Sequence, residues 1–241
     1  FFTDPYFGRL LKNTFMISGL TILFGFPAPI ILALMINEVK NSAFKRTVQT
    51  ITYMPYFISM VVLCGLLKTF SMQDGLFSQI ATVFGGKAQN FLANPNYFRT
   101  IYVLSDIWSG IGWNSIIYLA ALSSIDQEQY EAARVDGANR FQQMLHITLP
   151  GLVPTIMILF ILRMGNILNV GYEKILLLYN SATYSTADVI STYTYRLSFG
   201  GSGNPMYSKS TAIGLFNTII NVFFLMLTNM ISKKATDAGL F

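Results

Sequence analysis

Long uncharged apolar runs alternate with short polar segments along this chain. Apolar runs that lack Asp, Glu, Lys and Arg include residues 13–37, 47–67, 107–125, 147–162 and 210–232. About 20 apolar residues span the hydrocarbon core of a bilayer as a helix. Four of the runs reach that length, and the run at 147–162 reaches it only by including Arg163. The pattern therefore predicts an all-α, polytopic helical membrane protein with about five spans.

We expect one transmembrane domain over residues 1–241, with spans at about Leu10–Ile36, Thr47–Phe70, Tyr97–Leu122, Pro150–Gly171 and Ser208–Ile231. The loop Ser71–Asn96 is expected to hold a short amphipathic helix around Leu76–Phe84. The Tyr-rich segment Tyr172–Tyr207 includes "KILLLYN", which is apolar enough to re-enter the membrane. Because the chain begins without Met, a signal peptide or one further span can precede it.

Composition agrees with a bilayer environment and removes several other classes. Only 11% of residues are charged, against about 25% in soluble domains. The net charge of +5 comes from basic residues scattered between the spans, which favours membrane flanking over nucleic-acid binding. With one histidine and one cysteine, Cys64, the chain has neither a disulfide nor the ligands of an ordinary zinc site. "GGKA" at residues 85–88 fails as a phosphate-binding loop, so we predict no enzyme, cofactor or metal in this chain.

A polar insert, Ser123–Leu149, separates the third and fourth predicted spans. It reads as two short helices around Gly137, which permits a sharp change of direction, and either Ser124 or Asp126 can cap the first helix. The insert fits a stiff elbow on which a partner protein pushes. It fits an ordinary amphipathic interfacial helix equally well.

One spacing in this insert carries a family resemblance: Glu-Ala-Ala, three residues, Gly, nine residues, Ile-x-Leu-Pro. The matching residues are Glu131, Ala132, Ala133, Gly137, Ile147, Leu149 and Pro150. This pattern resembles the EAA loop of permeases from type I ATP-binding-cassette (ABC) importers. "DGA" at 136–138, "DPYFGRLLKNTF", "MPYFIS", "GNILNVGYEKILLLYN" and the ending "AGLF" are similar to the sugar and oligosaccharide branch.

The resemblance implies the type I importer fold, a bacterial cytoplasmic membrane location, and a coupling helix at about 123–150 that seats in a groove of a cytosolic ATPase. It implies coupling roles for Glu131, Ala132, Ala133, Arg134, Asp136, Gly137 and Phe141. The implied partners are a second, related permease, two ATP-binding subunits that hold ATP and Mg²⁺, an extracytoplasmic solute-binding protein and an oligosaccharide.

Polar and aromatic side chains within the spans suit a sugar pathway, because sugars bind through hydrogen bonds and aromatic faces. The candidates are Tyr53, Tyr56, Trp108, Trp113, Asn114, Asn166, Asn169, Tyr172 and Glu173. For Tyr97, Tyr102, Tyr193 and Tyr195 we favour an interfacial belt, and for Asn217 and Asn221 a bridge between helices. Arg163 is compatible with snorkelling, a salt bridge or a cavity role. Glu173, about 15 Å further along a continuous helix, is too far to pair with it.

The function that these observations favour is one permease subunit of an oligosaccharide importer. The same machine for an amino acid, phosphate or polyamine is one alternative. An ion-gradient-driven transporter is another, although it predicts carboxylates or inverted repeats in the spans. Lys and Arg are nearly balanced between the two sides. The cluster Lys40, Lys45 and Arg46 and the terminal pair Lys233 and Lys234 favour a cytoplasmic polar insert only weakly.

Overall fold

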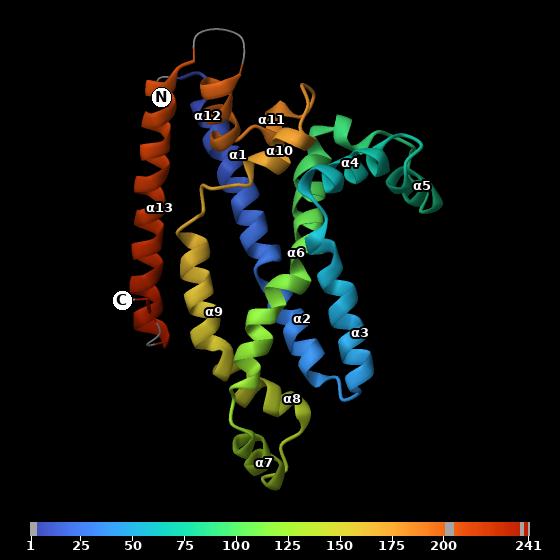
Figure 1. Cartoon of the computed structure of the whole chain (residues 1–241), viewed down its shortest axis with the longest axis vertical. Coiled ribbons are helices and arrows are strands. Elements are labelled where there is room, and N and C mark those ends of the chain that lie inside the picture. Colours follow the sequence, from blue (N-terminus) through green and yellow to red (C-terminus); the bar gives the residue numbers. More distant parts are fainter. Residues whose placement is uncertain (1–3, 201–204, 237–238, 241) are drawn as a thin grey trace.

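The computed structural model describes residues 4–200, 205–236 and 239–240 of the chain, and within these ranges all regular structure is helical (Figure 1). The ending "AGLF" is only partly inside the described residues. The α-helices are α1 Phe7–Leu20, α2 Pro27–Glu38, α3 Ser42–Tyr53, α4 Met60–Ser71, α5 Leu76–Val83, α6 Pro95–Ser123, α7 Gln127–Val135, α8 Arg140–Gln143, α9 Leu149–Met164, α10 Tyr172–Leu178, α11 Tyr184–Ala187, α12 Ile190–Phe199 and α13 Tyr207–Thr236.

The long helices run side by side in one bundle. The π-helical turn Thr21–Gly25 joins α1 to α2, and the rod they form lies beside α6, α9 and α13, with α3 at the other edge (Figure 1). The helices α7 and α8 project from one end of the bundle. At the opposite end lie α4, α5 and the short helices α10, α11 and α12. The polar insert is therefore separated from these short helices by the full length of the bundle.

Four helical stretches are long and apolar enough to cross a membrane: Phe7–Glu38, Met60–Val83, Arg140–Met164 and Tyr207–Lys234. The helix α6 has 29 residues, about 43 Å, and lies within the same bundle, although it carries Arg99 and Asp106. The first, third, fourth and fifth predicted spans thus each correspond to a long helix. The all-α, polytopic prediction is confirmed.

The second predicted span, Thr47–Phe70, is wrong as a single helix. The helix α3 ends at Tyr53 and a 3₁₀ turn follows at Met54–Phe57. Pro55 lacks a backbone donor, and Ser59 is extended and accepts a hydrogen bond from the Val62 amide, which starts α4 afresh. Figure 1 shows α4 running across the direction of α3. The stretch Met60–Val83 qualifies by length and composition but has a turn at residues 72–75.

The fourth predicted span begins earlier and ends earlier than its pattern indicates. Asn139 and Gln142 form a capping box at the start of α8, and the helix then continues through a π-helical turn, Met144–Thr148, into α9. The missing amide of Pro150 is absorbed by this wider turn. Pro150 therefore does not start the span, because the helix already begins at Arg140. At its other end the helix stops at Met164, short of Gly171.

The short helices α10–α12 close one end of the bundle around buried charges. The Asp188 side chain is 1% exposed, accepts two hydrogen bonds of 2.8 Å from Arg196, and lies 3.4 Å from Arg9. Burial works against the charged guanidinium, but these bonds outweigh it and raise the pKa of Arg196. The amphipathic helix predicted around Leu76–Phe84 is confirmed as α5.

Of the four tyrosines expected at the membrane interface, Tyr102 belongs instead to the packed interior, and Tyr193 is half-buried. Tyr102 is 4% exposed within the main core cluster. The Tyr193 hydroxyl donates a 2.5 Å hydrogen bond to Asp4. The bridging role expected for Asn221 is confirmed, because its side-chain oxygen accepts from the Leu168 amide, 3.1 Å away, which ties α13 to the segment after α9.

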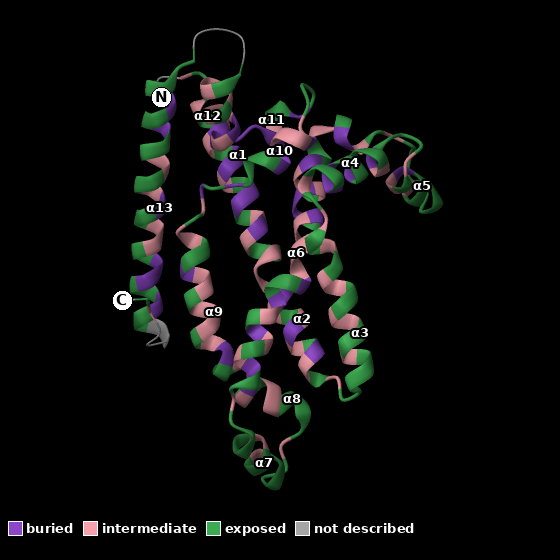
Figure 2. Ribbon diagram, in the orientation of Figure 1, coloured by how far each residue is buried: buried purple, intermediate pink, exposed green. Residues whose placement is uncertain are grey.

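Apolar side chains cover much of the outside of the bundle. Figure 2 shows exposed positions along α13 and α3 and over most of α7. On α13 the exposed apolar side chains include Leu215, Ile219, Phe223 and Met226, each more than half exposed. Surfaces of this kind suit lipid tails or another membrane helix. The exposed residues of α7, in contrast, are mainly polar.

Candidate functional site

The polar insert is built around α7 by two caps that its sequence encodes. Asp126, not Ser124, caps the helix start by accepting a 3.0 Å hydrogen bond from the Glu128 amide. At the other end the Ala138 amide bonds to the Ala133 carbonyl and the Gly137 amide to the Arg134 carbonyl. This is the Schellman pattern, and Gly137 has the φ of +81° that it requires. The two-helix prediction around Gly137 is confirmed.

Six of the seven predicted coupling residues lie on α7 or the turn that follows it, and Phe141 lies on α8; both helices project from the same end of the bundle (Figure 2). All are exposed except Ala133, which is half-buried. Val135, between them, is 88% exposed, and Phe141 is 67% exposed. Among the described residues Glu131, Arg134 and Asp136 make no salt bridge. Their charges are therefore available to another protein.

The base of this tip is fastened to the bundle by contacts that sequence reasoning missed. The Tyr130 and Thr148 hydroxyls form a 2.9 Å hydrogen bond between α7 and the π-helical turn before α9. A Cβ on Gly151 would lie 2.7 Å from Ile125 Cδ1, so the loop packs tightly against the first turn of α9. A displacement of α7 consequently acts on α9 directly.

Inside the bundle, the π-helical turn Thr21–Gly25 opens the wall of α1–α2. Pro27 and Pro29 cannot donate the backbone bonds that an α-helix needs at these positions. The widened turn just before them places Thr21 and Gly25 on the wall of a cavity. Turns of this type commonly occur at functional sites.

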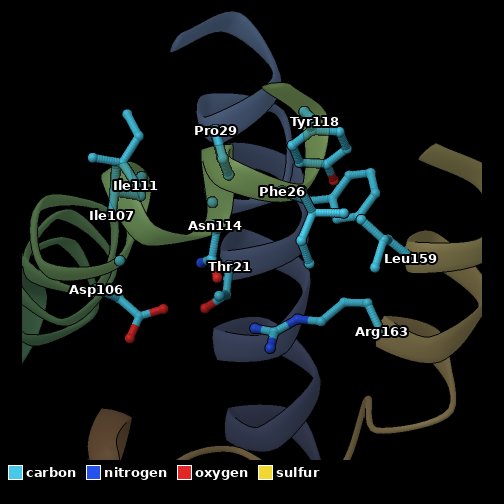
Figure 3. A pocket seen from close by; sticks show the side chains of 13 residues that line it. Thr21, Phe26, Pro29, Asp106, Ile107, Ile111, Asn114, Tyr118, Leu159 and Arg163 are labelled. Atoms are coloured by element: carbon cyan, nitrogen blue, oxygen red, sulfur yellow. The ribbon is translucent and has the colours of Figure 1, made fainter. Parts of the chain in front are cut away.

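Two cavities that share polar and charged wall residues meet at this turn. The Asn114 cavity, of about 210 Å³, lies between α1–α2, α6 and α9, and its lining includes Phe26, Asn114 and Tyr118 (Figure 3). The Asn166 cavity, of about 240 Å³, is lined by Ser18, Tyr102 and the segment after α9 that contains Asn166 and Asn169. Thr21, Asp106 and Arg163 line both cavities.

Three of the nine predicted pathway residues line these cavities: Asn114, Asn166 and Asn169. The last two lie beyond the end of α9, where the Asn169 side-chain amide donates a 3.1 Å hydrogen bond to Asn166. The other six predicted residues, which line neither cavity, are Tyr53, Tyr56, Trp108, Trp113, Tyr172 and Glu173.

Aromatic packing accounts for several of these six. The Tyr56 and Trp113 rings stack at 4.6 Å, and the Tyr172 and Tyr195 rings stack at 5.8 Å. Tyr53 packs against Gly112, on the face of α6 that contacts α3. These side chains therefore support helix packing in this chain.

The sequence analysis missed two charged residues at the cavities, Asp106 and Lys174. The Lys174 ammonium lies 3.4 Å from the Asp106 carboxylate and donates a 3.0 Å hydrogen bond to the Tyr102 carbonyl. Its side chain is only 2% exposed. Glu173, its neighbour in sequence, is exposed and forms no ion pair with any described residue.

This chain is similar to known transport proteins. The family model for the inner membrane component of binding-protein-dependent transport systems matches residues 25–237. Protein LplB of Bacillus subtilis (strain 168) is 43% identical over all of this chain and 75% of its own length. The polygalacturonan/rhamnogalacturonan transport system permease protein YteP of the same organism is 41% identical over all of this chain and 74% of its own.

A solved structure agrees. A chain in the crystal structure of a bacterial alginate ABC transporter, in complex with an alginate pentasaccharide-bound periplasmic protein, superposes with a TM-score of 0.94 at 47% identity. The match covers 99% of this chain and 82% of that chain.

The bundle, the exposed α7 tip and the polar cavities define a multi-pass transmembrane permease with the type I ABC importer fold. The chain belongs to the family of inner membrane components of binding-protein-dependent transport systems. The resemblance found in the EAA-type spacing is confirmed, and the chain is a transport component of a membrane.

Proposed function

We propose that this chain forms half of the translocation pathway of an ATP-driven importer for oligosaccharides. A second, related permease subunit, two cytosolic ATP-binding subunits and an extracytoplasmic solute-binding protein complete the complex. ATP and Mg²⁺ bind to the ATP-binding subunits, and this chain has no catalytic residue of its own. The substrates are breakdown products of polysaccharides, in line with the substrates named for YteP and the alginate transporter.

One observation carries the proposal: a single helical stretch connects the exposed tip to the cavities. Arg140–Met164 is continuous through its π-helical turn. Its 25 residues span about 37 Å. Arg163, at its far end, lines both cavities. A push on the tip therefore moves the cavity wall as a rigid rod.

In this mechanism α7 is the coupling helix. Glu131 and Arg134 make charged contacts with the ATP-binding subunit, and Asp136 and Phe141 add a polar and an apolar contact. Ala132, Ala133 and Gly137 keep the helix narrow enough for the groove. Closure of the two ATP-binding subunits on ATP moves α7, and the bundle alternates between outward- and inward-facing states.

The cavities supply the sugar contacts. Asn114 on one side and Asn166 and Asn169 on the other offer amide donors and acceptors to hydroxyl groups. Phe26 and Tyr118 offer aromatic surface within the Asn114 cavity. Amides and aromatic rings are the usual complement of a sugar.

Site-directed labelling tests the position of α7. Cys64 is the only cysteine of the chain and is 2% exposed, so thiol background is low. A membrane-impermeant maleimide should label Val135→Cys only in inside-out vesicles. The matched control is Phe84→Cys, 85% exposed at the end of α5 and at the opposite end of the bundle, which should label only in right-side-out vesicles. Labelling of Val135→Cys from outside would end the proposal.

Reconstitution tests the energy source. Proteoliposomes with all subunits should take up an oligosaccharide only with internal ATP and the solute-binding protein. Uptake that needs a proton or sodium gradient instead would favour the ion-gradient alternative.

A further inference from the structure

The charges around the two cavities do not cancel. Lys174 and Asp106 lie 3.4 Å apart and form a pair that is neutral in itself. Asp106 and Arg163 are the two charged side chains that line both cavities, and Lys174 lines neither. Since Lys174 neutralises Asp106, the space between Asn114 and Asn166 carries a net positive charge from Arg163.

The side chain of Arg163 is exposed toward the cavities, and its guanidinium has no partner among the described residues. Across the described part of the chain no hydrogen bond or ion pair involves its nitrogens. Figure 3 shows the side chain extending from α9 into the cavity toward Thr21, with Asp106 reaching in from the opposite wall. A charge held inside a membrane protein is costly without a partner or water. The arrangement therefore calls for an anion that visits the cavity.

A guanidinium selects the kind of anion. Its planar fork matches a carboxylate with two parallel hydrogen bonds, which a neutral hydroxyl cannot provide. The amides of Asn114 and Asn166, on either side of Arg163, bind hydroxyl groups of the same or the next sugar unit.

We infer that Arg163 recognises the carboxylate of a uronic acid unit in transit and makes this permease selective for acidic oligosaccharides. The inference rests on the proposed function and narrows its substrate class. Alginate, named for the solved transporter, is an acidic polysaccharide, and the polygalacturonan and rhamnogalacturonan named for YteP contain uronic acid units. Lys174 has a different role: it holds Asp106 away from Arg163 and so keeps the guanidinium free.

The test uses the complete complex in proteoliposomes with a galacturonate trisaccharide as the probe. Arg163→Gln should lower ATP-dependent uptake about tenfold or more, because a charged, bidentate contact is lost. Arg163→Lys keeps the charge and should lose only about threefold. Lys12→Gln removes an exposed positive charge from α1 outside both cavities and should transport like the wild type.

A second probe separates recognition from packing. With the methyl ester of the trisaccharide, which has no charge, Arg163→Gln and wild type should differ by less than about twofold, and wild type should prefer the acid. The comparison of variant with wild type for each probe cancels any preference of the solute-binding protein.

Three results would overturn the inference. They are equal losses of uptake in Arg163→Lys and Arg163→Gln, no loss of uptake in Arg163→Gln, or a loss in Arg163→Gln that is the same for the acid and the ester. If Arg163→Gln does not assemble, Arg163→Lys decides: relative to wild type it should lose uptake of the acid and keep uptake of the ester. Wild-type uptake of a neutral trisaccharide but not of the uronate would refute this inference alone. Wild-type uptake of neither, with ATP present, would refute the proposed function.

Discussion

The Tyr130 and Thr148 hydroxyl oxygens lie 2.9 Å apart and join α7 to the helix that leads into α9. Thr148 is 2% exposed, so the bond is sheltered from water on its side. Together with the contact of Ile125 with Gly151, this bond fastens α7 to the bundle. It makes the elbow stiff enough to transmit a displacement.

Tyr130→Phe should weaken coupling more than folding. The variant loses a hydrogen bond between neutral groups, about 0.5–1.5 kcal/mol in the free energy of unfolding. The elbow becomes looser, so more ATP is hydrolysed for each oligosaccharide imported. The measurement is the ratio of ATP hydrolysed to sugar taken up in proteoliposomes.

Thr148→Val provides the partner variant. If the bond transmits motion, the double variant should be no worse than either single variant, because both remove the same contact. Tyr207→Phe, which loses the hydroxyl of an exposed tyrosine at the start of α13, is the control and should keep the wild-type ratio. If the two substitutions had additive effects on the ratio of ATP hydrolysed to sugar imported, the bond between Tyr130 and Thr148 would not be what transmits the motion.

A bulky residue at Gly137 would test whether α7 seats in a groove of the ATP-binding subunit, but the φ of +81° at Gly137 confounds a Gly137→Leu variant. A leucine there costs roughly 1–2 kcal/mol of backbone strain whatever it contacts, whereas asparagine tolerates this conformation. Gly137→Asn should therefore preserve assembly and still reduce uptake severalfold, because its side chain enlarges the helix end. Gly85→Asn, at a second glycine with a φ of +81° and open surroundings, should leave uptake unchanged. Normal uptake by Gly137→Asn would exclude groove seating.

The prolines show what the apolar pattern can predict and what it cannot. Runs of uncharged residues predicted the rod α1–α2, α6, α9 and α13. They could not predict that the chain stays helical past Pro27, Pro29 and Pro150 but breaks at Pro55. A π-helical turn absorbs the missing amides in the first cases, and an extended Ser59 follows in the last. These outcomes depend on packing against other helices, which a local pattern does not contain.

One part of the candidate site could be predicted from the sequence and another could not. The α7 tip could be predicted because its caps and its spacing are local in sequence. The charge pair near the cavities could not, because Asp106 and Lys174 are 68 positions apart. In the sequence each of them simply borders an apolar run. A signal was present: Asp106 falls well inside a helix of 29 residues, where a carboxylate needs a partner.

Asn114 and Trp113 are neighbours on α6 with different surroundings, so their alanine variants should fail differently. Asn114 lines a cavity, whereas Trp113 stacks on Tyr56 and lies edge-on to Phe57. Asn114→Ala should reduce oligosaccharide-stimulated ATP hydrolysis severalfold with little change in thermal unfolding. Trp113→Ala should lower stability by about 1–3 kcal/mol, since it removes a large packed ring. The reverse assignment of the two effects would show that the pathway runs along the Trp113 face.

Gly112 sets the crossing of α6 and α3. A Cβ at this position would lie 2.1 Å from the Thr52 carbonyl oxygen, and backbone atoms cannot give way as a side chain can. Gly112→Ala should lower the free energy of unfolding by roughly 1–3 kcal/mol, as overpacking does. Gly65→Ala, inside α4 with open space around it, should be neutral or slightly stabilising. Thermal unfolding of the purified complex measures both. Equal effects would mean that α3 and α6 are not in close contact.

Asp4 should make the stability of the α1–α12–α13 junction depend on pH. Hydrogen bonds from Lys209, at 2.6 Å, and from Tyr193 lower the pKa of Asp4 to about 2 from its ordinary 3.8. Because the folded-state pKa is depressed, the stabilisation is complete above pH 3.8 and is lost as the pH falls toward 2. Since Lys209 is partly exposed, we expect the charged Asp4 to stabilise the folded state by about 1–2 kcal/mol at neutral pH and by about half of that near pH 3.

Thermal unfolding of wild type and Asp4→Asn should thus differ at pH 6 and converge at low pH. The control is Asp74→Asn, at an exposed aspartate in the turn between α4 and α5, which should match wild type throughout. A constant difference between wild type and Asp4→Asn across this range would show that Asp4 contributes by packing and not by its charge.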